Sequence, residues 1–232
     1  NLIKKNIKKT NSSDVTFFNK DLNVLLSEKR FDYIDVDPFG SPAGFIDSAV
    51  RSIKNYGIIA CTATDTTALC GVYPKVCVRR YGAKSCHSPC MKETAVRILL
   101  GFIAREAAKY DKAVVPVLSY SSDHYFRVYV KIVKGAKEAN SSVEKIDFVS
   151  SEKCFFSKKK KEYFGPMWLG DLHDKKTLAI LREILSTKNL NTKNRVYQML
   201  DLMEAETVLP AFFYNVDEIS SFLKTTAPKM KK

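Results

Sequence analysis

The order of apolar and polar positions divides residues 1–133 into alternating predicted strands and helices. Apolar runs of the kind that buried strands need cover residues 33–37 and 58–64, and a shorter run covers residues 15–18. Between the two longer runs, apolar residues recur at helical spacing from residue 41 to residue 55. This alternation is typical of a parallel α/β sheet, with residues 33–37 as its central strand.

Residues with strong positional preferences mark the ends of these helices. Asp21 precedes a predicted helix over residues 22–29 and has the side chain of an N-cap. Ser41 suits the N-cap of the next helix, Pro42 its first position and Gly57 its end.

Two further patterns complete the first part of the chain. Residues 91–109 form a long predicted helix with one apolar face. Residues 114–120 and 125–133 alternate like paired strands, so we expect a hairpin that completes the sheet. The sequence therefore predicts an α/β domain over residues 1–133.

The pattern changes beyond Gly135. Lysine-rich loops and a Gly-Pro-Met-Trp-Leu-Gly turn are followed by amphipathic helices near residues 177–185, 195–206 and 216–223. We expect a smaller, mainly helical α+β domain over residues 134–232, with Trp168 as its core anchor.

Composition adds an expected class of partner to this fold. The chain of 232 residues is 45% hydrophobic and 27% charged, which is typical of a globular protein. Its formal net charge is +13: residues 1–133 carry 20 basic and 12 acidic groups, and the remainder 18 and 13. Because both parts are basic, a folded RNA lying across both is the expected partner.

The six cysteines indicate an intracellular protein with reduced thiols. The sequence contains no signal peptide and no apolar run long enough to span a membrane. Cys86 and Cys90 could form half of a metal site, but Cys154 stands alone and supplies no second pair at zinc-finger spacing. We therefore predict that no metal is bound.

The strongest candidate chemistry lies where the 33–37 strand ends. An exocyclic amine on a nucleobase is a poor nucleophile, because its lone pair is delocalised into the ring. The Asp37 carboxylate could accept one of its N–H groups and the backbone carbonyl at Asp37–Pro38 the other, while Phe39 offers a face for the base to stack on. The alternative is an ordinary strand end with an Asp-Pro turn and a core Phe.

A long connection over residues 65–90 supplies the candidate RNA contacts Lys75, Arg79, Arg80 and Lys84. Loops at the carboxyl ends of sheet strands are where α/β enzymes place substrate contacts. The alternative is a solvated surface helix over residues 73–81. A second basic run, at residues 158–161, is interpreted as a solvated loop.

Six segments in order, from about residue 20 to the C-terminus, resemble one family, the tRNA guanine-26 N2-dimethyltransferases. The segments are Asp35-Val-Asp-Pro-Phe-Gly-Ser-Pro42, Cys61-Thr-Ala-Thr-Asp65 with Leu69-Cys-Gly71, Arg97-Ile-Leu-Leu-Gly101, Ile103-Ala-Arg105 with Ala107-Ala-Lys-Tyr110, Asp123-His-Tyr-Phe-Arg127, and Gly165-Pro-Met-Trp-Leu-Gly170 with His173-Asp174.

The resemblance implies a partial, Rossmann-like class I methyltransferase sheet and transfer of methyl groups from S-adenosylmethionine to the N2 amine of guanosine 26 in tRNA. It also implies that Asp37, Pro38 and Phe39 are catalytic. Asp21 and Leu22 would contact the adenine of the donor, with Leu22 where the family has Ala. Arg127 joins the expected tRNA contacts.

Two departures from the family's pattern limit which functional roles the resemblance assigns to this chain. The family usually has Cys-His-Glu where this chain has Met91-Lys92-Glu93, so no role for that His is assigned. A doubly wound methyltransferase also needs a Gly-rich turn after its first strand, and this chain has no Gly-x-Gly. We therefore expect a fragment that lacks the N-terminal half of the donor site and is inactive alone.

Alternative functions remain open from the sequence. A non-catalytic RNA-binding module could have kept the scaffold and lost the donor site. An N6-adenine methyltransferase uses a similar Asp/Asn-Pro-aromatic element, although the other five segments argue against it. The expected location is the nucleus in a eukaryote and the cytoplasm in an archaeon.

Overall fold

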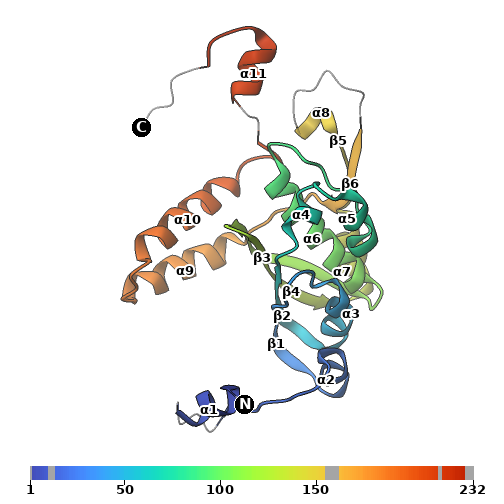
Figure 1. The fold of residues 1–232 in the computed structure, drawn as a ribbon, viewed down its shortest axis with the longest axis vertical. Coiled ribbons are helices and arrows are strands. Elements are labelled where there is room, and N and C mark those ends of the chain that lie inside the picture. Colours follow the sequence, from blue (N-terminus) through green and yellow to red (C-terminus); the bar gives the residue numbers. More distant parts are fainter. Residues whose placement is uncertain (1, 10–13, 155–161, 214–215, 228–232) are drawn as a thin grey trace.

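The computed structural model describes residues 2–9, 14–154, 162–213 and 216–227. Figure 1 shows a four-stranded sheet with helices packed along one side and a helical hairpin projecting from the other. The basic run at residues 158–161 lies outside the described residues.

The sheet has the strand order β1-β2-β4-β3. Strand β1 (Phe31–Val36) runs parallel to β2 (Ile53–Ala63), and β4 (Tyr125–Lys134) runs antiparallel to both β2 and β3 (Lys112–Ser122). The expected hairpin is therefore confirmed. The expectation that residues 33–37 form a central strand is wrong, because β1 lies at the edge of the sheet formed by the described residues.

Alternation along β1 separates its two faces. Ile34 and Val36 are buried, whereas Tyr33 and Asp35 are exposed. The buried face packs against α3 (Ala43–Ser52), whereas α6 (Met91–Ala108) packs on β3 and β4. The two helices contribute Ile46, Ala49, Ile98 and Leu99 among others to one hydrophobic core. Burial on one face alone fixes the register, because a slip of one residue would exchange the two faces.

Two local expectations near the N-terminus are corrected. Residues 15–18 form no strand, and the helix α1 (Leu2–Lys9) precedes them. Helix α3 ends at Ser52 rather than residue 55, so Gly57 lies inside β2 instead of closing the helix. A Cβ on Gly57 would lie 2.9 Å from the Asp32 carbonyl oxygen, which explains why glycine is needed at this close strand contact.

The hydrophobic core continues across the expected domain boundary after residue 133. Helix α7 (Ala136–Val143) packs on β3, and β5 (Ile146–Ser150) pairs with β6 (Tyr163–Trp168). The predicted turn at residues 165–170 therefore begins as a strand. Trp168 is 1% exposed, as expected of an anchor, but it lies in the same core as α6. The boundary itself stays a prediction.

The predicted C-terminal helices are confirmed. Helices α9 (Lys175–Thr187) and α10 (Lys193–Glu206) form the projecting hairpin (Figure 1), with a small core of their own that packs on Leu118 and Tyr120 of β3. Helix α11 (Val216–Leu223) follows, apart from this hairpin in Figure 1.

Candidate active site

The loop that follows β1 presents Asp37 and Phe39 to solvent. Asp37 is exposed, and its carboxylate has no hydrogen-bond or ion-pair partner in the described ranges. Phe39 is 104% exposed, so the alternative of a core Phe is wrong. A fully exposed aromatic ring beside an unpartnered carboxylate serves no packing purpose in this chain and is instead suited to a flat, polar-edged ligand.

The same loop is fixed to the carboxyl end of the neighbouring strand. The Gly40 N–H donates to the Thr64 hydroxyl at 2.7 Å, and the Gly40 carbonyl accepts from the Thr64 N–H at 3.0 Å. Gly40 has φ +87°, a left-handed conformation that other residues adopt only with strain. The loop can therefore hold Phe39 in one place without burying it.

Helix α3 begins one residue later than expected. Its N-cap is Pro42, and the Ser41 hydroxyl accepts a hydrogen bond from the Ala43 N–H at 3.3 Å. Ser41 thus still satisfies a free N–H group at the start of the helix, as predicted.

On the predicted donor side, Asp21 is the N-cap of α2 (Leu22–Glu28). Its carboxylate accepts hydrogen bonds from the Asn23 N–H at 2.8 Å and the Val24 N–H at 3.4 Å. Leu22 is partly buried against the core. The structure therefore supports the capping role of Asp21, in which Oδ1 accepts both bonds, and leaves Oδ2 and the backbone groups for the predicted adenine contact.

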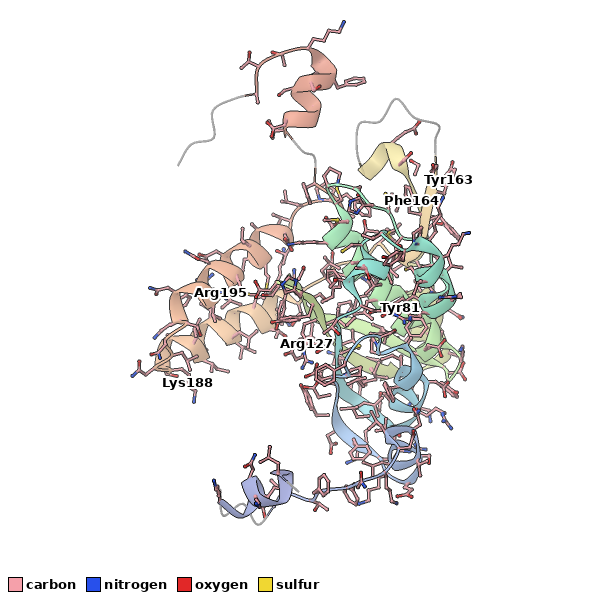
Figure 2. The ribbon with its side chains drawn as sticks, viewed as in Figure 1. Tyr81, Arg127, Tyr163, Phe164, Lys188 and Arg195 are labelled. Atoms are coloured by element: carbon pink, nitrogen blue, oxygen red, sulfur yellow. The ribbon has the colours of Figure 1, made fainter. Side chains whose placement is uncertain are left out.

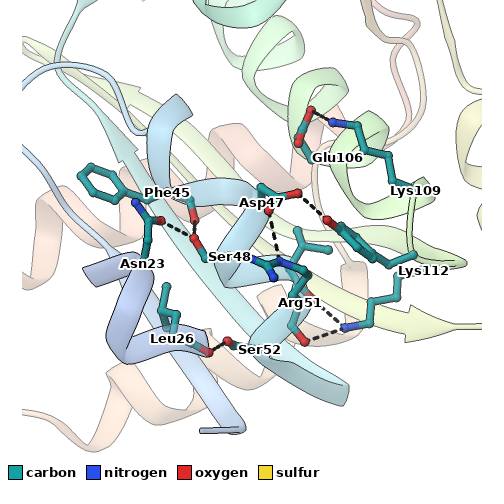
Figure 3. Close-up of polar contacts among 12 residues, drawn as sticks. Asn23, Leu26, Phe45, Asp47, Ser48, Arg51, Ser52, Glu106, Lys109 and Lys112 are labelled. Atoms are coloured by element: carbon teal, nitrogen blue, oxygen red, sulfur yellow. Dashed lines mark hydrogen bonds and ion pairs between the residues drawn. The ribbon is translucent and has the colours of Figure 1, made fainter. Parts of the chain in front are cut away.

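Helix α2 is tied to α3, which follows the loop (Figure 3). The Ser48 hydroxyl donates to the Asn23 side chain, and the Ser52 hydroxyl donates to the Leu26 carbonyl. Asp21 and the Asp37 loop therefore belong to elements that pack together, as the two sides of one site require.

The predicted basic connection contains two helices, α4 (Thr66–Leu69) and α5 (Pro74–Tyr81). The surface-helix interpretation of residues 73–81 is thus right about structure. Lys75 and Arg79 are exposed, and neither has an ion-pair partner in the parts of the chain that are described.

The other two predicted basic contacts are already engaged. Arg80 Nη1 lies 3.0 Å from Asp65 Oδ2, and Lys84 Nζ lies 2.9 Å from Glu162 Oε2. The Lys84 ammonium also lies 5.3 Å from the centre of the Phe164 ring. These two cations are therefore weaker candidates for phosphate contacts than Lys75 and Arg79.

Arg127 is held by the sheet. Its guanidinium donates two hydrogen bonds of 2.7 Å to the Asp35 carboxylate and one of 2.5 Å to the Thr62 hydroxyl, and the residue is 9% exposed. The Asp35 carboxylate raises the pKa of Arg127 above its usual range. This engagement argues against the predicted RNA contact (Figure 2 labels Arg127).

Sequence reasoning did not single out Asp35, the partner of Arg127. The pairing links β1 to β4 across β2, because Asp35 faces Ala60 while Arg127 faces Thr62. Its only signal in the sequence was the spacing from Asp37, two residues later, which puts both side chains on the same face of the predicted 33–37 strand.

No disulfide bond joins the cysteines at positions 61, 70, 77, 86 and 90. Burial raises the pKa of the Cys61 thiol strongly and that of Cys77 to about 11. In the described ranges no three His, Cys, Asp or Glu side chains gather as a metal site would require. The absence of bound zinc stays a prediction.

No helix in the described ranges combines the length and the apolar character that a membrane span requires.

Comparison with known proteins identifies what this chain is similar to. The family model of N2,N2-dimethylguanosine tRNA methyltransferase matches residues 1–232. A tRNA (guanine(26)-N(2))-dimethyltransferase of Methanobrevibacter smithii is 36% identical over 245 residues, covering 97% of this chain and 63% of the relative. The corresponding protein of Pyrococcus furiosus is 39% identical over 224 residues, covering 91% and 58%.

A solved structure gives the same result. The complex of Trm1 from Pyrococcus horikoshii with S-adenosyl-L-methionine superimposes with a TM-score of 0.80 at 36% identity, covering 88% of this chain and 58% of that one. The chain thus spans about three fifths of the length of the relatives that it matches.

Proposed function

This chain belongs to the N2,N2-dimethylguanosine tRNA methyltransferase family, and we propose that it supplies the amine-binding side of a tRNA guanine-26 N2-methyltransferase. In the protein of full natural length, the reaction transfers methyl groups from S-adenosylmethionine to guanosine, giving N2,N2-dimethylguanosine. The partner is tRNA, and the expected location remains intracellular.

The observation that supports this proposal is the exposed pair of Asp37 and Phe39 on an anchored loop. Phe39 is fully exposed although it is a large apolar residue, and Asp37 is exposed beside it without a partner. An unpaired guanine brings an apolar face and an amine edge, which match the ring and the carboxylate respectively. The guanine must leave its stack to reach both groups.

The residues of this chain activate and orient the amine. The bound donor supplies an electrophilic methyl group on its sulfonium sulfur, and the C–S bond breaks as the N2–C bond forms. The Asp37 carboxylate accepts one N–H of the amine, so it stabilises the positive charge that develops on N2 and can take up the released proton. The backbone carbonyl at Asp37–Pro38 accepts the second N–H.

A second methylation requires fewer hydrogen bonds from the same site. After the first transfer one N–H remains, and Asp37 can hold it while the new methyl group takes the place of the other. The open surroundings of the loop agree with this, because Asp37 and Phe39 are both exposed to solvent.

The residues that support tRNA binding are Lys75 and Arg79. Both project from α5, whose N-terminal residue Pro74 follows closely on β2 through the short helix α4. Their free positive charges would contact phosphates near the flipped guanosine, and the net charge of +13 supplies longer-range attraction.

The experiment uses the protein of full natural length, donor with a labelled methyl group, and three tRNA transcripts. Guanosine at position 26 should accept label and yield monomethyl and dimethyl products on mass analysis. Inosine at position 26 lacks the N2 amine and should accept none, while adenosine there distinguishes an N6-adenine methyltransferase. Strong tRNA binding without transfer to guanosine would favour the non-catalytic RNA-binding module instead.

A further inference from the structure

A chain of hydrogen bonds ties the loop at residues 37–42 to helix α5. The Ser41 hydroxyl donates to the Tyr81 hydroxyl oxygen at 2.8 Å, and the Tyr81 hydroxyl donates to Asp65 Oδ1 at 2.7 Å. Arg80 Nη1 donates to Asp65 Oδ2 at 3.0 Å. Linked bonds of this kind polarise one another, so the chain is stronger than its separate members.

The centre of this chain of hydrogen bonds is shielded from water. Tyr81 is 0% exposed, and the Asp65 side chain is 7% exposed. The Tyr81 ring packs edge-on against Phe102 of α6, with 5.5 Å between ring centres (Figure 2 labels Tyr81). Burial and the Asp65 carboxylate raise the pKa of Tyr81, so the hydroxyl keeps its proton and can donate to Asp65 while accepting from Ser41.

The position of Tyr81 connects this contact to the predicted RNA-binding residues of α5. Tyr81 is the last residue of α5, whose exposed side carries Lys75 and Arg79. The other end of the hydrogen-bond chain is Ser41, two residues after Phe39. Helix α5 thus joins the basic surface to the loop that presents the ring.

We propose that Tyr81 is a positioning residue for methyl transfer, whose hydroxyl holds Ser41 and thereby sets the place of Phe39 and of the Asp37–Pro38 carbonyl relative to α5. The inference rests on the proposed function of the loop. Tyr81 contacts neither tRNA nor donor, and it acts through Ser41 and Asp65.

The hydroxyl is separable from the structural role of the ring. The aromatic ring fills the core beside Phe102, whereas the hydroxyl contacts only the loop side and Asp65. The hydrogen bonds between Gly40 and Thr64 do not involve this hydroxyl and are a second anchor of the loop. Loss of the hydroxyl should therefore loosen the loop without unfolding it.

The test compares Tyr81→Phe with a matched control, Tyr110→Phe. Tyr110 also donates to an aspartate, Asp47 of α3, at 2.6 Å, but neither residue of this pair belongs to the loop at residues 37–42. In the protein of full natural length, Tyr81→Phe should lower the single-turnover rate about 10- to 100-fold at unchanged tRNA affinity, because small misplacements of reacting groups cost this much. Tyr110→Phe should retain the wild-type rate.

Hydrogen exchange provides a readout that does not depend on activity. The Gly40 amide should exchange faster in Tyr81→Phe and remain at the wild-type rate in Tyr110→Phe. Wild-type rate and wild-type exchange in Tyr81→Phe would overturn the inference while the proposed function stands. If the wild-type protein transfers no methyl group while the Gly40 amide still exchanges faster in Tyr81→Phe, the proposed function is overturned instead. Equal rate losses in the two tyrosine variants would show a general structural effect and also overturn the inference.

Discussion

Replacing Asp37 with Asn tests the proposed chemistry most directly. The substitution keeps the shape and one acceptor oxygen but removes the charge, so the amine keeps a hydrogen bond while its developing positive charge loses stabilisation. We expect the rate of methyl transfer in the full-length protein to fall by about 10² to 10⁴, on the order of 3–5 kcal/mol.

The structure also predicts what this substitution leaves unchanged. Asp37 is exposed and has no partner in the described ranges, so its replacement should change the free energy of unfolding by no more than about 0.5 kcal/mol. Affinity for tRNA should also be retained. Single-turnover rates at saturating donor separate the chemical step from binding, and thermal unfolding reports the stability.

Two aspartates of β1, the strand that precedes the loop, serve as matched controls. Asp35→Asn weakens the pair with Arg127 and should cost about 1–2 kcal/mol of stability, since Asp35 is half-exposed and partly screened by solvent. Asp32→Asn removes a surface pair with Lys54 and should change neither stability nor rate. Near wild-type chemistry in Asp37→Asn would show that backbone groups alone orient the amine and would refute the assigned role.

The remaining predictions concern the stacking ring, the basic helix and the thiols. Phe39→Ala should cost about 1–3 kcal/mol in tRNA binding or transfer, measured by single-turnover titration, and nothing in melting temperature because the ring is fully exposed. Changing Lys75 and Arg79 together to Ala should weaken tRNA binding and reduce the slope of log affinity against log salt by roughly 0.7–0.9 per lost contact; an unchanged slope would make α5 a scaffold. Because burial raises the pKa of Cys77 to about 11, the unfolded state loses this thiol proton first, so the contribution of Cys77 to stability should fall by about 1 kcal/mol per pH unit between about pH 9 and pH 11, and Cys77→Ala should remove that part of the fall in urea unfolding curves. Elemental analysis should find no zinc, and one zinc per chain would contradict the prediction from cysteine spacing.

Local sequence determined most of the secondary structure and the centre of the candidate site. Strand β1, helix α6 and the β3–β4 hairpin follow from periodicity that neighbouring residues encode by themselves. The placement of Asp37 and Phe39 at a strand end is equally local, since it needs only the strand and the Pro and Gly that terminate it. Element ends were less predictable: residues 53–55 fit a helical period, but strand pairing with β1 incorporates Ile53 into β2.

Tertiary structure alone decided which charged groups are available to a ligand. Arg127 and Asp35 are 92 residues apart in sequence, Lys84 and Glu162 are 78 apart, and Ser41 and Tyr81 are 40 apart. No periodic pattern encodes such pairs, because they depend on which strands and helices become neighbours and in which register. The sequence could therefore count the positive charges of this protein, but only the packed chain separates those that neutralise its own carboxylates from Lys75 and Arg79, which remain exposed.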